Sequence, residues 1–382
     1  MAPKKKLLYV VRYQLDKSFN LKAKFDGQIR AFENLGYDVY YLGFDAQHFY
    51  LINGNDKTVV GKTHFNIPGY FHTLCYQNLY SHARKAVREM NFDCVYWRAA
   101  PELPAALGLA RQIKKTGGCF IYEYPTYPVS TEKSMSFLRT VYSVYSKSLR
   151  KKIEALADGF VLIGEDAGGS YNGKIAVNIS NGINLEVLQP RKPKPDGETI
   201  HILALASMSY WHGYDRLIRS LAEYKGAENV LIHMVGGNDG GCIPEWKALT
   251  EELGLTERVI FHGGKSGSEL DEMFDLCDIG VNSLGMYRKG FSVTSELKSR
   301  EYAARGLPFV CSVDDPALGF AKEPMWLRVA NDDSIPDMEV IVAFALRMRG
   351  DADSVEKLRA YAREYMTWES QYKKVFETIQ VK

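Results

Sequence analysis

The sequence predicts an α/β protein made of two Rossmann-like domains that face a cleft. Apolar segments of strand length alternate with helical segments along most of the chain, and a proline-rich segment interrupts this alternation once before it restarts. With 382 residues, the chain is also too long for one ordinary hydrophobic core. Strands that alternate with helices form parallel sheets with right-handed crossovers, so each half is expected to be doubly wound.

The composition argues against several classes of protein. Hydrophobic residues make up 46% and charged residues 25%, as in ordinary soluble proteins, and a net charge of +2 gives no sign of a nucleic-acid partner. No apolar run approaches the ~18 residues of a membrane span, and the first residues lack the apolar stretch of a signal peptide. The six cysteines have no metal-ligand spacing, so we expect reduced thiols in a cytoplasmic protein.

The first half is expected to open with a β-α-β unit and to continue the same alternation. No Gly-x-Gly-x-x-Gly follows the first strand, which argues against a dinucleotide-binding fingerprint. The strands are expected at 7–11, 36–42, 94–98, 119–123, 159–163 and 175–179, with short polar strands over 46–67. The helices are expected at 25–35, 79–90, 104–115 and 134–157.

The predicted helix over 134–157 has two interpretations. Its apolar residues lie on one side and its basic residues on the other. Such a helix is typical of a surface helix packed on a sheet, and equally of a peripheral contact with the anionic inner face of a membrane.

A linker divides the chain at residues 189–197, which contain three prolines and four charged residues. We therefore expect a first domain over 1–188 and a second over 198–367. In the second half, strands are expected at 200–206, 230–235, 258–261, 279–282 and 308–311. Helices are expected at 213–224, 244–253, 268–277, 295–305, 340–348, 354–365 and 368–379.

The stretch 285–310 carries the main functional signal. It is predicted to form a basic loop around Gly290, then the helix over 295–305 closed by Gly306, then a short buried strand. A basic, glycine-containing loop before a helix N-terminus is a ready anion site, because the first helical amides lack partners and the dipole is positive there.

The same helix also fits a plain solvated helix. Glu296 with Arg300 and Glu301 with Arg305 are complementary i, i+4 pairs, and such pairs explain much of the charge on the helix. They do not explain the basic loop that precedes it.

The segment from Leu297 to Val310 resembles the nucleotide-sugar motif of retaining family 4 glycosyltransferases. That motif has two glutamates eight positions apart, then small residues, Gly-x-Pro and a hydrophobic strand. Glu301 falls on the second glutamate, whereas Val293 stands at the position of the first, and Glu296 is not at a spacing that replaces it. Weaker likenesses follow the same order along the chain, at 123–128, 180–182, 209–217 and 277–283.

The resemblance implies a GT-B fold and a reaction. The first domain would bind the acceptor, the helix over 368–382 would return to it, and the second domain would bind a nucleotide sugar. A sugar would pass, with retention at the anomeric carbon, from a nucleotide diphosphate sugar to a glycan or a polyprenyl-linked glycan. One alternative is a nucleotide-sugar epimerase on the same scaffold, which would need a pair of acid/base carboxylates and a histidine near the sugar, and the sequence shows no convincing set of these. The other is a non-catalytic binding subunit, which stays open because Val293 leaves the glutamate pair incomplete.

The expected site residues fall into three groups. The catalytic residues are Glu123, His212 and Lys298. The donor-binding residues are Gly213, Gly236, Arg288, Gly290, Phe291, Ser292 and Glu301. The residues on the acceptor side are Asn20, Lys24 and Tyr124.

Each group depends on a chemical requirement. The leaving diphosphate needs positive charge, and the family usually supplies it from an Arg and a Lys where this chain has Ser207 and His212. His212 could still donate to phosphate, or merely cap the turn, and Lys298, Arg288 and Arg300 could supply the charge. The Glu301 carboxylate only accepts hydrogen bonds, so it suits the ribose hydroxyls of the donor.

Glu123 is predicted at the end of a strand, where parallel sheets bind ligands, or else as a cap of the next turn. No essential metal is expected. The carboxylates of Asp351-Ala-Asp353 lie between two predicted helices, where Asp is a good N-cap, rather than after a core strand.

Overall fold

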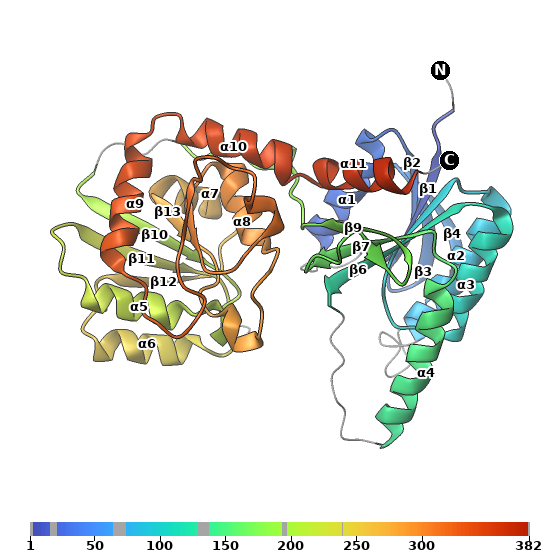
Figure 1. Ribbon diagram of the computed structural model, residues 1–382, viewed down its shortest axis with the longest axis horizontal. Helices are drawn as coiled ribbons and strands as arrows, with labels where there is room; N and C mark the ends of the chain where they lie inside the picture. Colours follow the sequence, from blue (N-terminus) through green and yellow to red (C-terminus); the bar gives the residue numbers. More distant parts are fainter. Residues whose placement is uncertain are drawn as a thin grey trace. The chain divides into compact units, whose positions relative to one another are not determined.

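The computed structural model describes residues 3–15, 21–63, 74–128, 137–192, 197–238 and 240–380, without the side chains of 137–143. The chain divides into two compact units, one formed by residues 1–179 with 368–382 and the other by 180–367 (Figure 1). Each unit is a sheet with helices on both faces, so the predicted fold class of two α/β domains is confirmed.

The first unit is built on a sheet with the strand order β4-β3-β2-β1-β5-β6-β7-β9-β8. Its central strands run parallel, while β3, β4 and β8 pair antiparallel with their neighbours. The strands are β1 (Lys6–Gln14), β2 (Asp38–Phe44), β3 (His48–Asn53), β4 (Asp56–Lys62), β5 (Cys94–Arg98), β6 (Cys119–Tyr127), β7 (Gly159–Gly164), β8 (Ser170–Tyr171) and β9 (Lys174–Ile179).

Helices cover both faces of this sheet, which explains why its central strands are continuous apolar runs. Residues of α2, α3 and α4 share one core with Leu8, Val10 and Trp97, while α1 and α11 share the opposite core with Leu7 and Tyr9. The helices are α1 (Lys22–Asn34), α2 (Leu74–Met90), α3 (Pro104–Thr116), α4 (Phe137–Glu154) and α11 (Trp368–Ile379).

The second unit has a parallel sheet with the order β12-β11-β10-β13-β14-β15. The strands are β10 (Thr199–Leu205), β11 (Asn229–Val235), β12 (Val259–Gly263), β13 (Ile279–Val281), β14 (Phe309–Cys311) and β15 (Trp326–Arg328). The helices α5 (Tyr214–Glu223), α6 (Ile243–Glu252) and α9 (Met338–Gly350) pack on one face, and α7 (Ser268–Leu276), α8 (Leu297–Arg305) and α10 (Ser354–Tyr365) pack on the other.

The observed division of the chain differs from the predicted one. It falls directly after β9, and the proline-rich segment lies inside the second unit. Arg191 attaches the start of this segment to the second unit, because its buried side chain donates to the carbonyls of Gly306 and Cys277 at 3.1 and 2.8 Å. The short strands β8 and β15 are absent from the sequence prediction. No helix within the described ranges is both long and apolar enough to cross a membrane.

Candidate functional site

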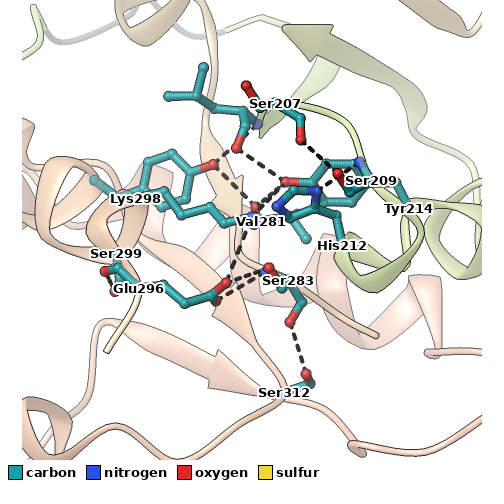
Figure 2. Close-up of polar contacts among 12 residues, drawn as sticks. Ser207, Ser209, His212, Tyr214, Val281, Ser283, Glu296, Lys298, Ser299 and Ser312 are labelled. Carbon is teal, nitrogen blue, oxygen red and sulfur yellow. Dashed lines mark hydrogen bonds and ion pairs between the residues drawn. The ribbon is translucent and has the colours of Figure 1, made fainter. Parts of the chain in front are cut away.

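The candidate site lies in the second unit, where β10 and β13 end. These strands are neighbours, but the chain leaves β10 toward β11 on one side and β13 toward β14 on the other. Such a reversal of strand order opens a crevice beyond the carboxyl ends of the two strands, and ligands of open α/β sheets bind in that position. Figure 2 shows side chains from the turn after β10 and the start of α5, from the end of β13 and the segment that leads to α8, from the first turn of α8, and from the residue after β14.

His212 lies in the turn after β10 and is held as a neutral ring. Its Nδ1 accepts the backbone N–H of Ser209 at 3.0 Å, so the neutral ring carries its proton on Nε2. Burial, together with the charges of Lys298 and Lys289, lowers the pKa of His212 to about 2, against the opposing effect of the Ser209 hydrogen bond. His212 is therefore a hydrogen-bond donor through Nε2 at any ordinary pH, and none of the residues that the structure describes accepts this hydrogen bond.

Lys298 provides a cation close to His212. It stands in the first turn of α8, and its Nζ donates to the Tyr214 hydroxyl at 3.2 Å (Figure 2). Burial lowers the pKa of Lys298 to about 8, against the opposing effect of Glu296, whose Oε1 lies 3.9 Å from Nζ. The Lys298 amine therefore loses its proton at a lower pH than an ordinary lysine does.

Glu296 belongs to the same polar network. Its carboxylate accepts the backbone N–H of Ser283 at 3.2 Å and also the Ser283 hydroxyl. Ser283 follows β13, and its carbonyl accepts the Ser312 hydroxyl at 2.9 Å. This chain of contacts fixes the segment before α8 against the ends of β13 and β14, as Figure 2 shows.

Two buried tyrosine hydroxyls support the base of the site. Tyr214 and Tyr302 both donate to the carbonyl of Val281, at 3.2 and 3.1 Å, and both are buried. Tyr302 lies four residues after Lys298 on α8, so the face of the helix that carries Lys298 points at the strand ends. Lys298 is thus carried by a helix that is hydrogen-bonded, through Tyr302, to the core strand β13.

Two of the predicted glycines are required by close backbone contacts. Gly213 has φ +64°, and a Cβ there would lie 2.5 Å from the backbone nitrogen of Gly285. Gly236 has φ +137°, and a Cβ there would lie 1.7 Å from the carbonyl oxygen of Ala206. Both glycines allow the loops after β10 and β11 to pack tightly against neighbouring backbone.

The basic loop before α8 is built differently from the prediction. Met286–Lys289 forms a 3₁₀ turn that ends at Gly290, and Phe291 and Ser292 follow before α8 begins at Leu297. Six residues thus separate Gly290 from Leu297, the first residue of α8.

The two basic residues of this loop have different environments. Arg288 is neutralised, because its Nη atoms donate to both carboxylate oxygens of Asp215 at 2.9 and 2.7 Å. Lys289 is exposed, with its Nζ 4.4 Å from the centre of the Trp211 ring. Lys289 therefore contributes positive charge to the site, whereas the charge of Arg288 is balanced by Asp215.

Glu301 lies on α8, three residues after Lys298 and thus on the same side of the helix. Its Oε1 accepts Arg305 Nε at 3.2 Å, as the predicted i, i+4 pair requires. Arg305 also donates to Asp271 of α7 at 2.5 Å. Burial raises the pKa of Glu301, Arg305 opposes this effect, and a quarter of the Glu301 side chain stays exposed.

Arg300 does not supply charge to the site. It is fully buried, and its Nη2 donates to Asp315 Oδ1 at 2.7 Å while Nη1 contacts the other carboxylate oxygen. Its Nε donates to the carbonyl of Asn181 at 2.9 Å. The predicted pair of Arg300 with Glu296 is absent, because Glu296 is the N-cap of α8 and lies outside the helical geometry that such a pair needs.

The predicted residues of the first unit are buried and do not form an open site. Glu123 is fully buried in β6, where it accepts Tyr96 at 2.7 Å and Arg98 at 2.5 Å. Tyr124 is buried on the other face of the sheet and donates to Glu154. Lys24 is buried with its Nζ 5.2 Å from the centre of the Trp368 ring, and Asn20 lies outside the described residues.

Sequence reasoning missed the roles of Ser283, Tyr214 and Tyr302, and it misassigned Glu296. The spacing between these residues carries no signal, since 13 to 67 positions separate the hydrogen-bond partners that meet at the end of β13. The described residues contain no group of three or more His, Cys, Asp or Glu side chains that could hold a metal ion. The Asp351 carboxylate accepts hydrogen bonds from the backbone N–H of Asp353 and from the Lys357 amine, as a helix-capping residue does.

Comparison with known proteins identifies the second unit. Residues 188–322 match the family described as "Glycosyl transferases group 1". No curated protein sequence matches the chain. Among solved structures, a sucrose-phosphate synthase from Thermosynechococcus elongatus is 15% identical, with a TM-score of 0.63 over 99% of this chain and 98% of its own.

Two further structures have the same fold along their whole length. A glycosyltransferase from Rickettsia africae is 14% identical, with a TM-score of 0.63 over 99% of this chain and 98% of its own. HepE from Anabaena, solved with UDP, is 14% identical, with a TM-score of 0.61 over 98% of this chain and 99% of its own. Residues 188–322 thus form a group 1 glycosyltransferase domain, in a chain with the GT-B fold of these enzymes.

Proposed function

We propose that the protein transfers a sugar from a nucleoside diphosphate sugar to a glycan or a lipid-linked glycan, with retention at the anomeric carbon. The observation that carries the proposal is the cluster of Lys298, Lys289 and the Nε2–H of His212 at the carboxyl ends of β10 and β13. A diphosphate is a doubly charged acceptor of hydrogen bonds, so it matches two cations and a fixed neutral donor. HepE, which shares the fold, was solved with UDP and with UDP-glucose.

The same cluster would assist the reaction. When the glycosidic bond of the donor breaks, negative charge develops on the departing diphosphate, and donors already aimed at that charge lower the barrier. Lys298 and His212 are fixed by hydrogen bonds before any ligand arrives, so they need no reorganisation. With this charge supplied by side chains, we propose that turnover needs neither a cofactor nor a metal ion and continues in the presence of EDTA.

The reaction itself is tested by screening nucleotide sugars and analysing the products. Thermal shift identifies the donor, because a ligand at 100 times its Kd stabilises a protein by about 2.7 kcal/mol. NMR of the product then distinguishes transfer with retention from inversion and from epimerisation of the donor. A nucleotide sugar that binds but is neither hydrolysed nor transferred would favour a binding subunit.

Glu301 is proposed to accept the two ribose hydroxyls of the donor. Glu301→Gln should weaken UDP binding about tenfold in isothermal titration, because a charged hydrogen bond contributes roughly 1.5–3 kcal/mol. The alternative is that Glu301 only holds Arg305. Asp271→Asn is the matched control, since Asp271 binds the same arginine from α7. Equal UDP affinities in the two variants would contradict the proposed contact.

A peripheral membrane contact is proposed for α4. Its exposed side carries Val144 and Tyr145 at 65% and 50% exposure, next to Lys147, Lys151 and Lys152. Apolar side chains flanked by lysines favour anionic lipid, with about 1 kcal/mol for each lysine near the surface. Replacing the three lysines with glutamine should weaken binding to phosphatidylglycerol vesicles roughly a hundredfold in sedimentation assays. Wild-type protein that binds phosphatidylcholine vesicles equally well would refute an electrostatic contact.

A further inference from the structure

The first unit carries a basic pocket of about 480 Å³ between α4 and the hairpin formed by β8 and β9. Four of its lining residues are cations: Lys147, Arg150 and Lys151 on α4, and Lys174 on β9. α4 ends at Glu154 and leads into β7, and Lys174 is the first residue of β9, so the pocket lies toward the amino ends of these strands. Parallel sheets bind their substrates beyond the opposite, carboxyl ends, so this pocket is a separate site.

Glu154 gives the pocket its negative charge. It is buried, and it is the one carboxylate among the described residues that line the pocket. Its oxygens accept hydrogen bonds from Asn172 Nδ2 at 3.0 Å, from the Tyr171 hydroxyl at 3.2 Å and from the Tyr124 hydroxyl. The carboxylate is thus held by three neutral donors, and it cancels at most one of the four positive charges.

Two of the four cations are fixed by the protein. Arg150 Nε donates to Glu102 Oε1 at 2.5 Å, so the charge of Arg150 is balanced. Lys174 Nζ donates to the carbonyl of Ala155 at 2.7 Å and to the carbonyls of two neighbouring residues at the end of α4. The carboxyl end of a helix repels anions through its unpaired carbonyls, and Lys174 counters this effect by donating to them.

The other two cations, Lys147 and Lys151, are available to a ligand. Both are exposed, and neither has an ion-pair or hydrogen-bond partner in the part of the chain that the structure describes. They lie four residues apart on α4, where like charges repel, so an anion bound between them relieves the repulsion. Asp158, whose charge also acts on Lys174, is engaged by Lys114 at 2.6 Å.

We propose that this pocket binds a phosphate monoester. Four cations face the carboxylates of two glutamates, so two positive charges remain, and a monoester carries about −1.5 to −2 at pH 7 whereas a diester carries one charge. The terminal phosphate oxygens accept hydrogen bonds and thus match ammonium groups. The volume lies within the usual range of ligand pockets and holds a phosphate together with the alcohol that it esterifies. The proposal is independent of the proposed glycosyl transfer.

A phosphate monoester can belong to a soluble metabolite or to the headgroup of a membrane lipid. Val144 precedes Lys147 by three residues and Lys151 by seven, so it lies on the same side of α4, with 65% of its surface exposed. An apolar side chain beside the pocket would contact the acyl chains of a lipid whose headgroup is bound there. The two sources share the same phosphate chemistry, and two arms of one experiment distinguish them.

The first arm titrates glycerol 3-phosphate into the full-length protein by isothermal titration calorimetry. Lys147→Gln and Lys151→Gln should each weaken binding by about tenfold or more, because each removes a charged hydrogen bond to the phosphate. Lys152→Gln is the matched variant. Lys152 is the exposed neighbour of Lys151 on the same helix and carries the same charge, but it does not line the pocket. Its replacement should change the affinity less than twofold.

The second arm measures sedimentation with vesicles of phosphatidylcholine and phosphatidic acid, a lipid whose headgroup is the same phosphate monoester. Phosphatidylglycerol vesicles of equal surface charge present a diester instead. If the ligand is a lipid, the protein should bind the phosphatidic acid vesicles more tightly, and Lys151→Gln should weaken this binding about tenfold more than Lys152→Gln does. If the ligand is soluble, this difference between the two variants should appear in the titration.

A loss that is specific to Lys151 in either arm supports the site and identifies the source of the phosphate. Equal effects of Lys151→Gln and Lys152→Gln in both arms would mean a general attraction between a basic helix and anions, and would overturn the site. The absence of binding in both arms would overturn it as well. These outcomes do not depend on a nucleotide sugar, so the proposed transfer can fail without affecting them.

Discussion

Lys298→Ala should lower turnover with the donor sugar by about 10²- to 10³-fold, the usual effect of removing one preorganised donor to developing charge. The amine is fixed against Tyr214 at the strand ends, and the charge that remains near His212 comes from the exposed Lys289. Steady-state kinetics with the donor identified by the screen provide the measurement. Lys289→Ala is the matched control and should have a smaller effect, because an exposed cation is better screened by solvent.

The pH dependence of UDP affinity gives an independent test of Lys298. Its pKa of about 8 means that the amine is charged below pH 8 and loses its proton above it. If only the charged form binds the diphosphate, UDP affinity should fall about tenfold between pH 7 and pH 9. Lys298→Arg should abolish this fall, since arginine stays protonated. His212 should contribute no transition between pH 5 and 7, because its pKa is lowered to about 2. A wild-type affinity that is constant from pH 7 to 9 would place the diphosphate away from Lys298.

Arg300→Met should reduce the free energy of unfolding of the second unit by about 3–5 kcal/mol, measured by urea denaturation. Arg300 and Asp315 are both buried, and removing the cation leaves the carboxylate of Asp315 without compensation. The substitution also leaves the carbonyl of Asn181 without its donor.

Arg328→Met is the matched control for this loss. Arg328 pairs with Asp314 at 2.6 Å, but the two side chains are 46% and 66% exposed. An exposed ion pair contributes about 1 kcal/mol or less, so the variant should unfold nearly as the wild type does. Adding Asp315→Leu to Arg300→Met should recover part of the stability, because it removes the unpaired buried charge. Similar losses for Arg300→Met and Arg328→Met would contradict a structural role for the buried pair.

The fold could be predicted closely because both sheets are covered on two faces. Their central strands are therefore unbroken apolar runs, and glycines or charged residues mark where many of these runs end. The predicted and observed bounds agree fully for β5 and α11. The prediction missed the short edge strands β8 and β15, because with two and three residues they are too short to show a hydrophobic period.

Side-chain direction explains the errors at the site. The strand predicted to end at Glu123 continues to Tyr127, so Glu123 lies within the sheet rather than at its edge. Tyr124 follows it and points to the opposite covered face, because successive strand residues alternate. Likewise α1 begins at Lys22 rather than at Phe25, which puts Lys24 inside the helix and against Trp368. An error of three or four residues in the predicted boundary of a strand or helix thus placed in solvent a side chain that the structure buries in a core.

The return of α11 to the first unit has a consequence for synthesis of the protein on the ribosome. Residues 180–367, the entire second unit, are translated between β9 and the helix that covers one face of the first sheet. Until Trp368, Tyr372 and Val375 emerge from the ribosome, that face of the sheet lacks part of its apolar cover. Glu123 also lacks its contact with the Tyr372 hydroxyl, which lies 3.4 Å away in the complete unit. Domains generally fold as units during synthesis, so the second unit can fold while the first waits. The first unit is therefore completed after the second, and its partly uncovered apolar face needs protection from aggregation in the meantime.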